Sequence, residues 1–157
     1  MRIRRSLAVI SVILVVLLAG CSGSSSTASS TTSTAAPPTT TADPCRSGYQ
    51  AAASKLNSVA RKFSQAAQNG QMNEQFAAFA GEYVQAMKTF DTSVMALSCP
   101  DVVRNDLAAL VAAQTTLEPL VAQFAAGQRP AIPEFNAAAS AVADAVKKVN
   151  STLGITQ

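Results

Sequence analysis

Four segments of the chain repeat apolar residues at the three- and four-residue spacing of one helix face, and this pattern most constrains the fold. The four stripes are Tyr49, Ala52, Leu56, Val59, Phe63 and Ala66; Phe76, Phe79, Tyr83, Met87, Phe90, Val94 and Leu97; Val103, Leu107, Leu110, Gln114, Leu117, Val121 and Phe124; and Phe135, Ala139, Val142, Val146, Val149 and Leu153. Short connections make consecutive helices pack antiparallel. Residues 45–157 are therefore predicted to form one all-α domain, an antiparallel up-down-up-down four-helix bundle.

Residues that stop or start helices separate the stripes. They are Asn69-Gly70, Ser98-Cys99-Pro100, Gly127, Pro130 and Pro133. Pro100 suits the first turn of a new helix, with Ser98 or Cys99 at its boundary. Within the third stripe, Pro119 removes a backbone hydrogen bond and predicts a kink near residues 115–119. Such a kink either opens a ligand pocket between helices or is tolerated at the surface with Gln114 at the stripe edge, and the second interpretation is favoured.

The N-terminus has the pattern of an export signal. Arg2, Arg4 and Arg5 precede an apolar stretch over residues 7–18, which is too short for a stable span of roughly 20 apolar residues. The stretch closes on Leu18-Ala19-Gly20-Cys21, which resembles the lipobox of bacterial lipoproteins. The resemblance implies that residues 1–20 are a cleaved signal peptide and that Cys21 carries lipid. The alternatives are an ordinary secretory signal and a short uncleaved anchor.

A polar, low-complexity segment follows Cys21. Ser and Thr occupy 14 of the 23 positions from 22 to 44, and Asp43 is the only charged residue there. Such a segment buries too little apolar surface to fold, so residues 21–44 are predicted to be a lipidated, disordered tether. It is either a plain spacer or a stalk carrying O-linked sugar.

Lipobox, tether and alanine-rich composition together resemble small membrane-anchored lipoproteins of actinobacteria. The resemblance implies attachment to the outer face of the cell membrane and leaves the mechanism open. It rests on no signature within residues 45–157.

The charge balance argues against a nucleic-acid partner. The chain has 12 basic and 9 acidic residues, a net charge of +3. The surplus is accounted for by Arg2, Arg4 and Arg5, so the chain from residue 21 onward has 9 residues of each sign. A mature protein without net positive charge has no basic footprint for nucleic acid.

The two remaining cysteines, Cys45 and Cys99, lie at the start of the first predicted helix and the end of the second. Antiparallel packing brings these ends together, and an extracytoplasmic location permits oxidation. A structural disulfide is therefore predicted. The rival interpretation, a redox-active pair, lacks the Cys-x-x-Cys spacing typical of that chemistry.

Catalytic residue types are scarce, since the chain has no histidine and no tryptophan. Ser-His and Cys-His nucleophiles and most zinc sites are thereby excluded. The carboxylates lie off the apolar stripes and are interpreted as solvated. They are Glu74, Glu82, Asp91, Asp101, Asp106, Glu118, Glu134 and Asp144. We therefore expect no enzyme activity, no cofactor and no metal.

The methionines outside the signal segment, Met72, Met87 and Met95, are interpreted as core filling rather than as soft-metal ligands. Without histidine, the ligand sets that usually accompany methionine are incomplete.

Two functions fit these expectations. The first is a non-catalytic interaction module that engages another envelope protein while anchored through Cys21. The alternative is a carrier or sensor of an apolar or amphipathic small molecule bound between the helices. The pocket of the alternative would be lined by Phe79, Tyr83, Gln114, Leu117 and Phe124.

Overall fold

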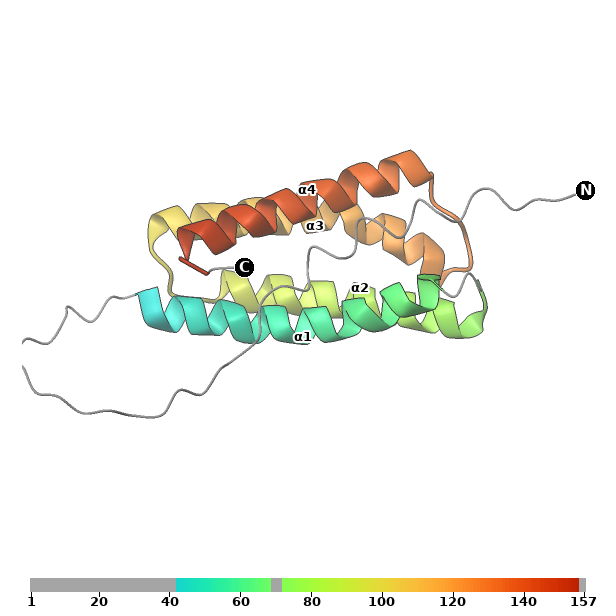
Figure 1. Ribbon diagram of the computed structural model, residues 1–157, viewed down its shortest axis with the longest axis horizontal. Helices are drawn as coiled ribbons and strands as arrows, with labels where there is room; N and C mark the ends of the chain where they lie inside the picture. Colours follow the sequence, from blue (N-terminus) through green and yellow to red (C-terminus); the bar gives the residue numbers. More distant parts are fainter. Residues whose placement is uncertain (1–41, 69–71, 156–157) are drawn as a thin grey trace, which may run out of the picture.

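Four α-helices run alternately up and down the molecule, as predicted (Figure 1). They are α1 (Ala42–Gln68), α2 (Glu74–Met95), α3 (Asp101–Ala125) and α4 (Ile132–Thr152). The computed structural model describes residues 42–68 and 72–155, with the backbone alone described at residues 42 and 43. The predicted signal peptide, the lipidation at Cys21, the Asn69-Gly70 stop and nearly all of the tether lie outside the described residues.

The helix starts differ in detail from expectation. Helix α1 begins at Ala42 rather than at residue 45, and Pro44 fits because the first turn needs no proline N–H. Helix α2 is capped by Asn73, whose Oδ1 accepts a hydrogen bond from the Phe76 N–H at 2.9 Å. Pro100 is the N-cap of α3 and not a residue of its first turn.

Glycines in the left-handed conformation end α3 and α4. Gly127 has φ 70°, and the Gln128 N–H donates back to the Gln123 carbonyl at 2.8 Å. Gly154 (φ 64°) ends α4 in the same way, and only the Gly127 stop was predicted. Other residues are strained at such φ values, so both chain reversals depend on glycine.

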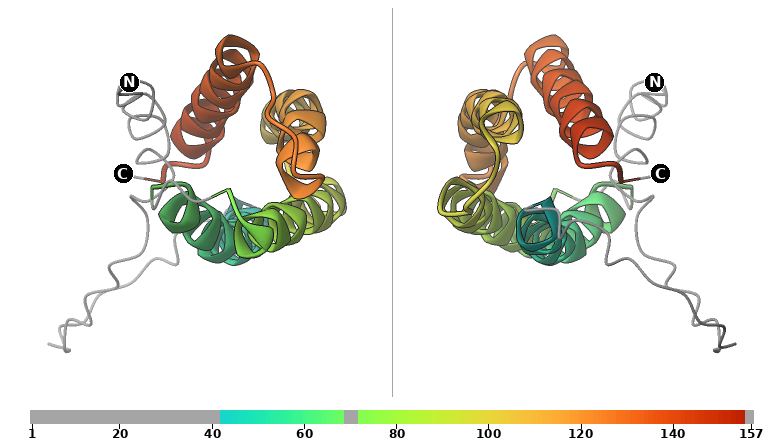
Figure 2. Two further views of the ribbon diagram at one scale, coloured as in Figure 1. Left: turned by 90° about the vertical axis from the view of Figure 1, so that its right-hand side faces the viewer. Right: turned by 90° about the vertical axis from the view of Figure 1, so that its left-hand side faces the viewer.

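The helices form two layers, α1 with α2 and α3 with α4 (Figures 1 and 2). Extensive packing follows chain order, α1 on α2, α2 on α3 and α3 on α4. Within the described part of the chain, α1 and α4 do not pack to a comparable extent. Three pairs of helices thus pack along extensive interfaces, here called seams, whereas a closed bundle has a fourth such interface.

The end of the molecule where α1 starts and α2 finishes is held by a disulfide. Cys45 and Cys99 are bonded across 54 residues, with their Cα atoms 5.1 Å apart, which confirms the predicted bridge. Beside it, α1 passes so close to the end of α2 that a Cβ on Gly48 would lie 2.5 Å from Leu97 Cδ2. Glycine at this position therefore leaves room for the Leu97 side chain beside the bridge.

The opposite end of the molecule is held together by contacts between aromatic side chains. Phe63 of α1 lies 5.2 Å from Phe76 and 5.5 Å from Tyr83 of α2, measured between ring centroids. It also lies 6.0 Å from Phe124 of α3, which contacts Phe135 of α4 at 5.5 Å. These five residues, the aromatic cluster, join all four helices at favourable ring separations.

Candidate functional site

Four of the five residues expected to line a pocket lie in the core. Tyr83, Leu117 and Phe124 are buried, and Gln114 is buried with them. Phe79 is only partly buried and lies outside the core, because Ala80 occupies the inward position of that helical turn. Two of the four, Tyr83 and Phe124, belong to the aromatic cluster, so aromatic side chains fill the space between the helices there.

Burial also determines the chemistry of the two tyrosines. It raises the pKa of Tyr49 and of Tyr83 to about 12. Their hydroxyls stay protonated at neutral pH and cannot serve as bases.

A shallow, open depression lies at the start of α1. Pro44, Arg46, Ser47 and Gln50 line it, and it includes none of the residues expected to form the pocket. Its openness to solvent makes it unlike the apolar, enclosing clefts that hold small molecules.

Asp106 is buried, which contradicts the expectation of a solvated carboxylate. It is 5% exposed, on the α3 flank that faces α4. Its Oδ1 lies 2.9 Å from Lys148 Nζ, and its Oδ2 accepts a hydrogen bond from the Thr152 hydroxyl at 2.7 Å. These two hydrogen bonds hold its pKa below the ordinary value. The sequence contains an indication of this burial, since Asp106 stands three residues after Val103 and four before Leu110, on the flank of the stripe.

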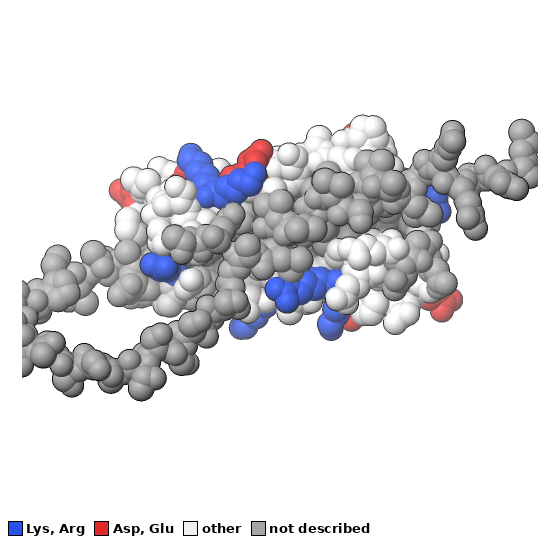
Figure 3. Space-filling view, in the orientation of Figure 1, with Lys and Arg blue, Asp and Glu red and all other residues white. Residues whose placement is uncertain are grey.

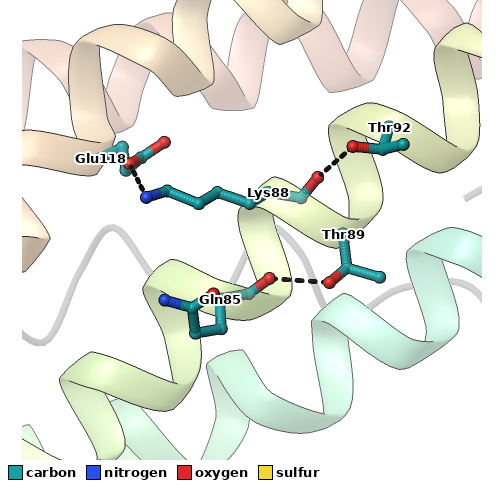
Figure 4. Close-up of polar contacts among 5 residues, drawn as sticks. All are labelled: Gln85, Lys88, Thr89, Thr92 and Glu118. Carbon is teal, nitrogen blue, oxygen red and sulfur yellow. Dashed lines mark hydrogen bonds and ion pairs between the residues drawn. The ribbon is translucent and has the colours of Figure 1, made fainter.

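A second polar cluster lies in the seam between α2 and α3. Lys88 of α2 reaches across to Glu118 of α3, with Nζ 3.0 Å from Oε1 (Figure 4). Asp91, one turn further along α2, is partly buried, and its Oδ1 is enclosed without a hydrogen-bond partner. Burial, with a contribution from the charge of Glu118, raises the pKa of Asp91 to about 6. Asp91 is thus a second exception to the expected solvated face.

Gln114 lies inside the core, so the expectation that it lies at the stripe edge was wrong, whereas Pro119 lies at the surface, as the favoured interpretation had it. Gln114 is 2% exposed, and its Oε1 has no hydrogen-bond partner. Helix α3 continues through the exposed Pro119 and slants toward the α1–α2 layer at its C-terminal end (Figure 1). The proline therefore faces solvent, while Gln114 faces inward.

The methionines divide between core and surface. Met87 is buried, as expected. Met72 and Met95 are 39% and 52% exposed, so core filling is wrong for these two. Met72 precedes α2, and Met95 is its last residue, next to the buried Val94.

The outward face of α3 is uncharged over most of its length. Beyond Arg104, its charged residues are the buried Asp106 and the paired Glu118. An exposed stripe of small side chains runs along this face, here called the α3 outer face. It consists of Ala108, Ala112, Thr115, Pro119 and Ala122. Among the described residues, α3 has the length and hydropathy of a membrane span, with one third of the window buried in the fold. A core helix passes the same test, and α3 packs on both α2 and α4.

Charges elsewhere are mixed in sign. Figure 3 shows basic and acidic side chains together over the C-terminal part of α4 and mainly basic ones along α1, with much of the remaining described surface uncharged. Within residues 42–68 and 72–155, no group of three or more Cys, Asp or Glu side chains is placed to hold a metal ion.

Comparison of the chain with protein-family models, with curated proteins and with solved structures gives no significant match.

Proposed function

We propose that the protein is a lipoprotein anchored to the outer face of the cell membrane through Cys21, and that its helical domain is a non-catalytic module that binds another envelope protein. The observation that carries the binding role is the α3 outer face, an exposed and uncharged surface on a helix packed between two others. A binding surface needs a rigid support, which α2 and α4 provide on either side.

The chemistry of the α3 outer face suits a protein partner. Small side chains such as Ala108 and Ala112 let a second helix approach closely. Covering them displaces water from apolar surface without removing any charge from water, so burial is favourable. Anchoring near the partner would raise its effective concentration, so that modest affinity suffices.

Site-specific photocross-linking in the native envelope tests this role. A photoreactive residue at Ala112 is expected to capture one defined envelope protein. The same residue at Ala141, an exposed alanine of α4, is the matched control and should not capture it. Equal capture from both positions, or none from Ala112, would contradict the proposed surface.

The anchor is tested separately. Cys21→Ala should move the protein from the membrane fraction to the soluble fraction, because two or three acyl chains give stable attachment and none remain. Continued membrane association of this variant would contradict lipid anchoring.

The carrier remains the second candidate, and one observation favours it. Among the described residues α1 and α4 do not pack extensively, and an apolar or amphipathic molecule would enter between the helices along that edge. Native mass spectrometry of the protein from its envelope distinguishes the two functions. A reproducible added mass of metabolite or lipid size, beyond the acyl chains on Cys21, would favour the carrier, and its absence would favour the interaction module.

A further inference from the structure

Two buried oxygen acceptors in the α2–α3 seam lack donors. They are Asp91 Oδ1 and Gln114 Oε1, each enclosed and without a hydrogen-bond partner. Leaving one such group unpaired costs about 1–3 kcal/mol. Two in one seam therefore indicate that the site holds something that can donate.

The helix register places Asp91 and Gln114 at the same level of the α2–α3 seam. Lys88 of α2 pairs with Glu118 of α3 at 3.0 Å. Because the two helices are antiparallel, one turn forward on α2 leads to Asp91 and one turn back on α3 leads to Gln114. Gly81 of α2 facing Ala125 of α3 follows the same register. The electrostatic effect of Glu118 on Asp91 is a separate sign that the cluster is compact.

The hydroxyl and ammonium donors nearest this site are already used. On α2, the Thr92 hydroxyl donates to the Lys88 carbonyl and the Thr89 hydroxyl to the Gln85 carbonyl, each at 2.9 Å (Figure 4). On α3, the Thr115 hydroxyl donates to the Val111 carbonyl at 2.9 Å. The ammonium group of Lys88 is directed to Glu118. No hydroxyl in the described part of the chain donates a hydrogen bond to Asp91 Oδ1.

We infer that the seam is a proton-binding site, in which Asp91 takes up a proton from solvent and donates it as a hydrogen bond to Gln114 Oε1. One proton then pairs both acceptors and removes a partly buried negative charge. When the proton leaves, two acceptors face each other beside Glu118, and the packing of α2 on α3 is weakened. The site thus links this seam to external acidity, independently of the proposed binding role.

The surrounding charges favour a proton over a metal ion. Facing Asp91 are Glu118 from α3 and Lys88 from its own helix. Arg104, the other charged residue on this side of α3, bonds to Asp101 at the helix start. On the opposite flank of α2, Lys62 of α1 pairs with Glu82 at 3.6 Å. The ammonium group of Lys88 would repel a second cation, and too few oxygens converge to replace the water around one.

The test is a side-chain NMR titration of the full-length protein in detergent, from about pH 4 to about pH 8. The Asp91 carboxyl is expected to titrate with a midpoint of about 6. The side-chain amide of Gln114 should shift with the same midpoint, while that of the exposed Gln128 should not. Asp91 titrating near its ordinary value of about 3.9, or a Gln114 amide that does not follow it, would overturn the inference.

Matched variants separate the site from general effects of pH. Asp91→Asn should abolish the Gln114 transition, whereas Asp144→Asn, which removes an exposed carboxylate of α4, should leave it intact. Glu118→Gln should lower the midpoint of Asp91, because a like charge is removed. Glu82→Gln, on the opposite flank of α2, should not change it. If Asp91→Asn does not fold, the wild-type titration alone decides.

Discussion

Two aspartates lie in the two seams of α3, and their environments are opposite. Asp106, in the seam with α4, has a partner for each carboxylate oxygen, and its pKa is lowered. Asp91, in the seam with α2, has a buried oxygen without a partner, and its pKa is raised to about 6. The same side chain is thus stabilised as an anion in one seam and as a neutral acid in the other.

The pKa values of the two aspartates shift in opposite directions because the facing helix presents different groups to each carboxylate. Helix α4 offers Lys148 and Thr152, two donors one turn apart. On α3, the carboxylate of Glu118 acts on Asp91, and at the same level of the helix register lies the unpaired Oε1 of Gln114. Burial raises the pKa in both seams, so the facing donors decide which protonation state is stable. Removing or replacing the two carboxylates should therefore change stability in opposite directions in the two seams.

The largest effect is expected for Asp106→Ala. It removes both contacts to α4, including a charge-assisted one, and should lower the free energy of unfolding at neutral pH by about 2 kcal/mol. The measurement is urea unfolding followed by circular dichroism. An unchanged midpoint would show that the contacts of Asp106 with Lys148 and Thr152 do not contribute to stability, and would contradict the contrast drawn between the two aspartates.

Asp91→Asn should act in the opposite direction. The amide of Asn is a permanent donor for Gln114 and carries no charge, so the variant should gain about 1 kcal/mol at pH 7.5. The gain should vanish near pH 4.5, where the wild-type carboxyl is protonated. Unfolding at the two pH values checks both parts, and destabilisation at pH 7.5 would contradict the view of Asp91 as unpaired.

The wild-type protein should show a maximum of stability on the acid side of neutrality. The contribution of Asp106, whose folded pKa is lowered, is present above its ordinary pKa and is lost as the pH falls. The contribution of protonated Asp91, whose folded pKa is raised, is present below its ordinary pKa and is lost as the pH rises through about 6. Partial exposure of Asp91 keeps the second change below about 1 kcal/mol.

Thermal unfolding across the pH range measures this profile. Stability that rises steadily from pH 5 to pH 8 would contradict the assignment of Asp91. In Asp91→Asn, the decrease between the ordinary pKa of about 3.9 and the folded pKa of about 6 should be absent.

The smallest effect is expected for Asp144→Asn. Asp144 pairs with Lys147 on the exposed surface of α4 at 3.3 Å. Exposed pairs of this spacing contribute about 0.3–0.5 kcal/mol, so the urea midpoint should hardly move. A loss as large as that of Asp106→Ala would mean that charge count, and not the facing donors, decides stability.

Much of the architecture could be predicted because helix periodicity is local. All residues of the stripe from Val103 to Phe124 are buried, including Gln114, and Gly127 ends α3 as expected. The disulfide between Cys45 and Cys99 followed from antiparallel packing together with the expected extracytoplasmic location. These features depend on spacing within a helix or on the direction of consecutive helices, both of which the residues specify.

The candidate sites were less predictable because they depend on neighbours distant in sequence. Asp106 and Thr152 are 46 residues apart, and no local pattern relates them. Phe79 was a member of the predicted stripe of α2 and Ala80 was not, yet packing placed Ala80 in the core. Whether α1 closes on α4 is likewise a property of the assembled helices.

By itself, the amino-acid sequence determined the number, direction and inward faces of the helices, because apolar spacing and chain connectivity act within or between adjacent segments. Only the tertiary structure decided which carboxylates lie in seams and whether a donor or an acceptor meets each one. The physical reason is that the pKa and stability of a buried polar group depend on the groups facing it from another helix.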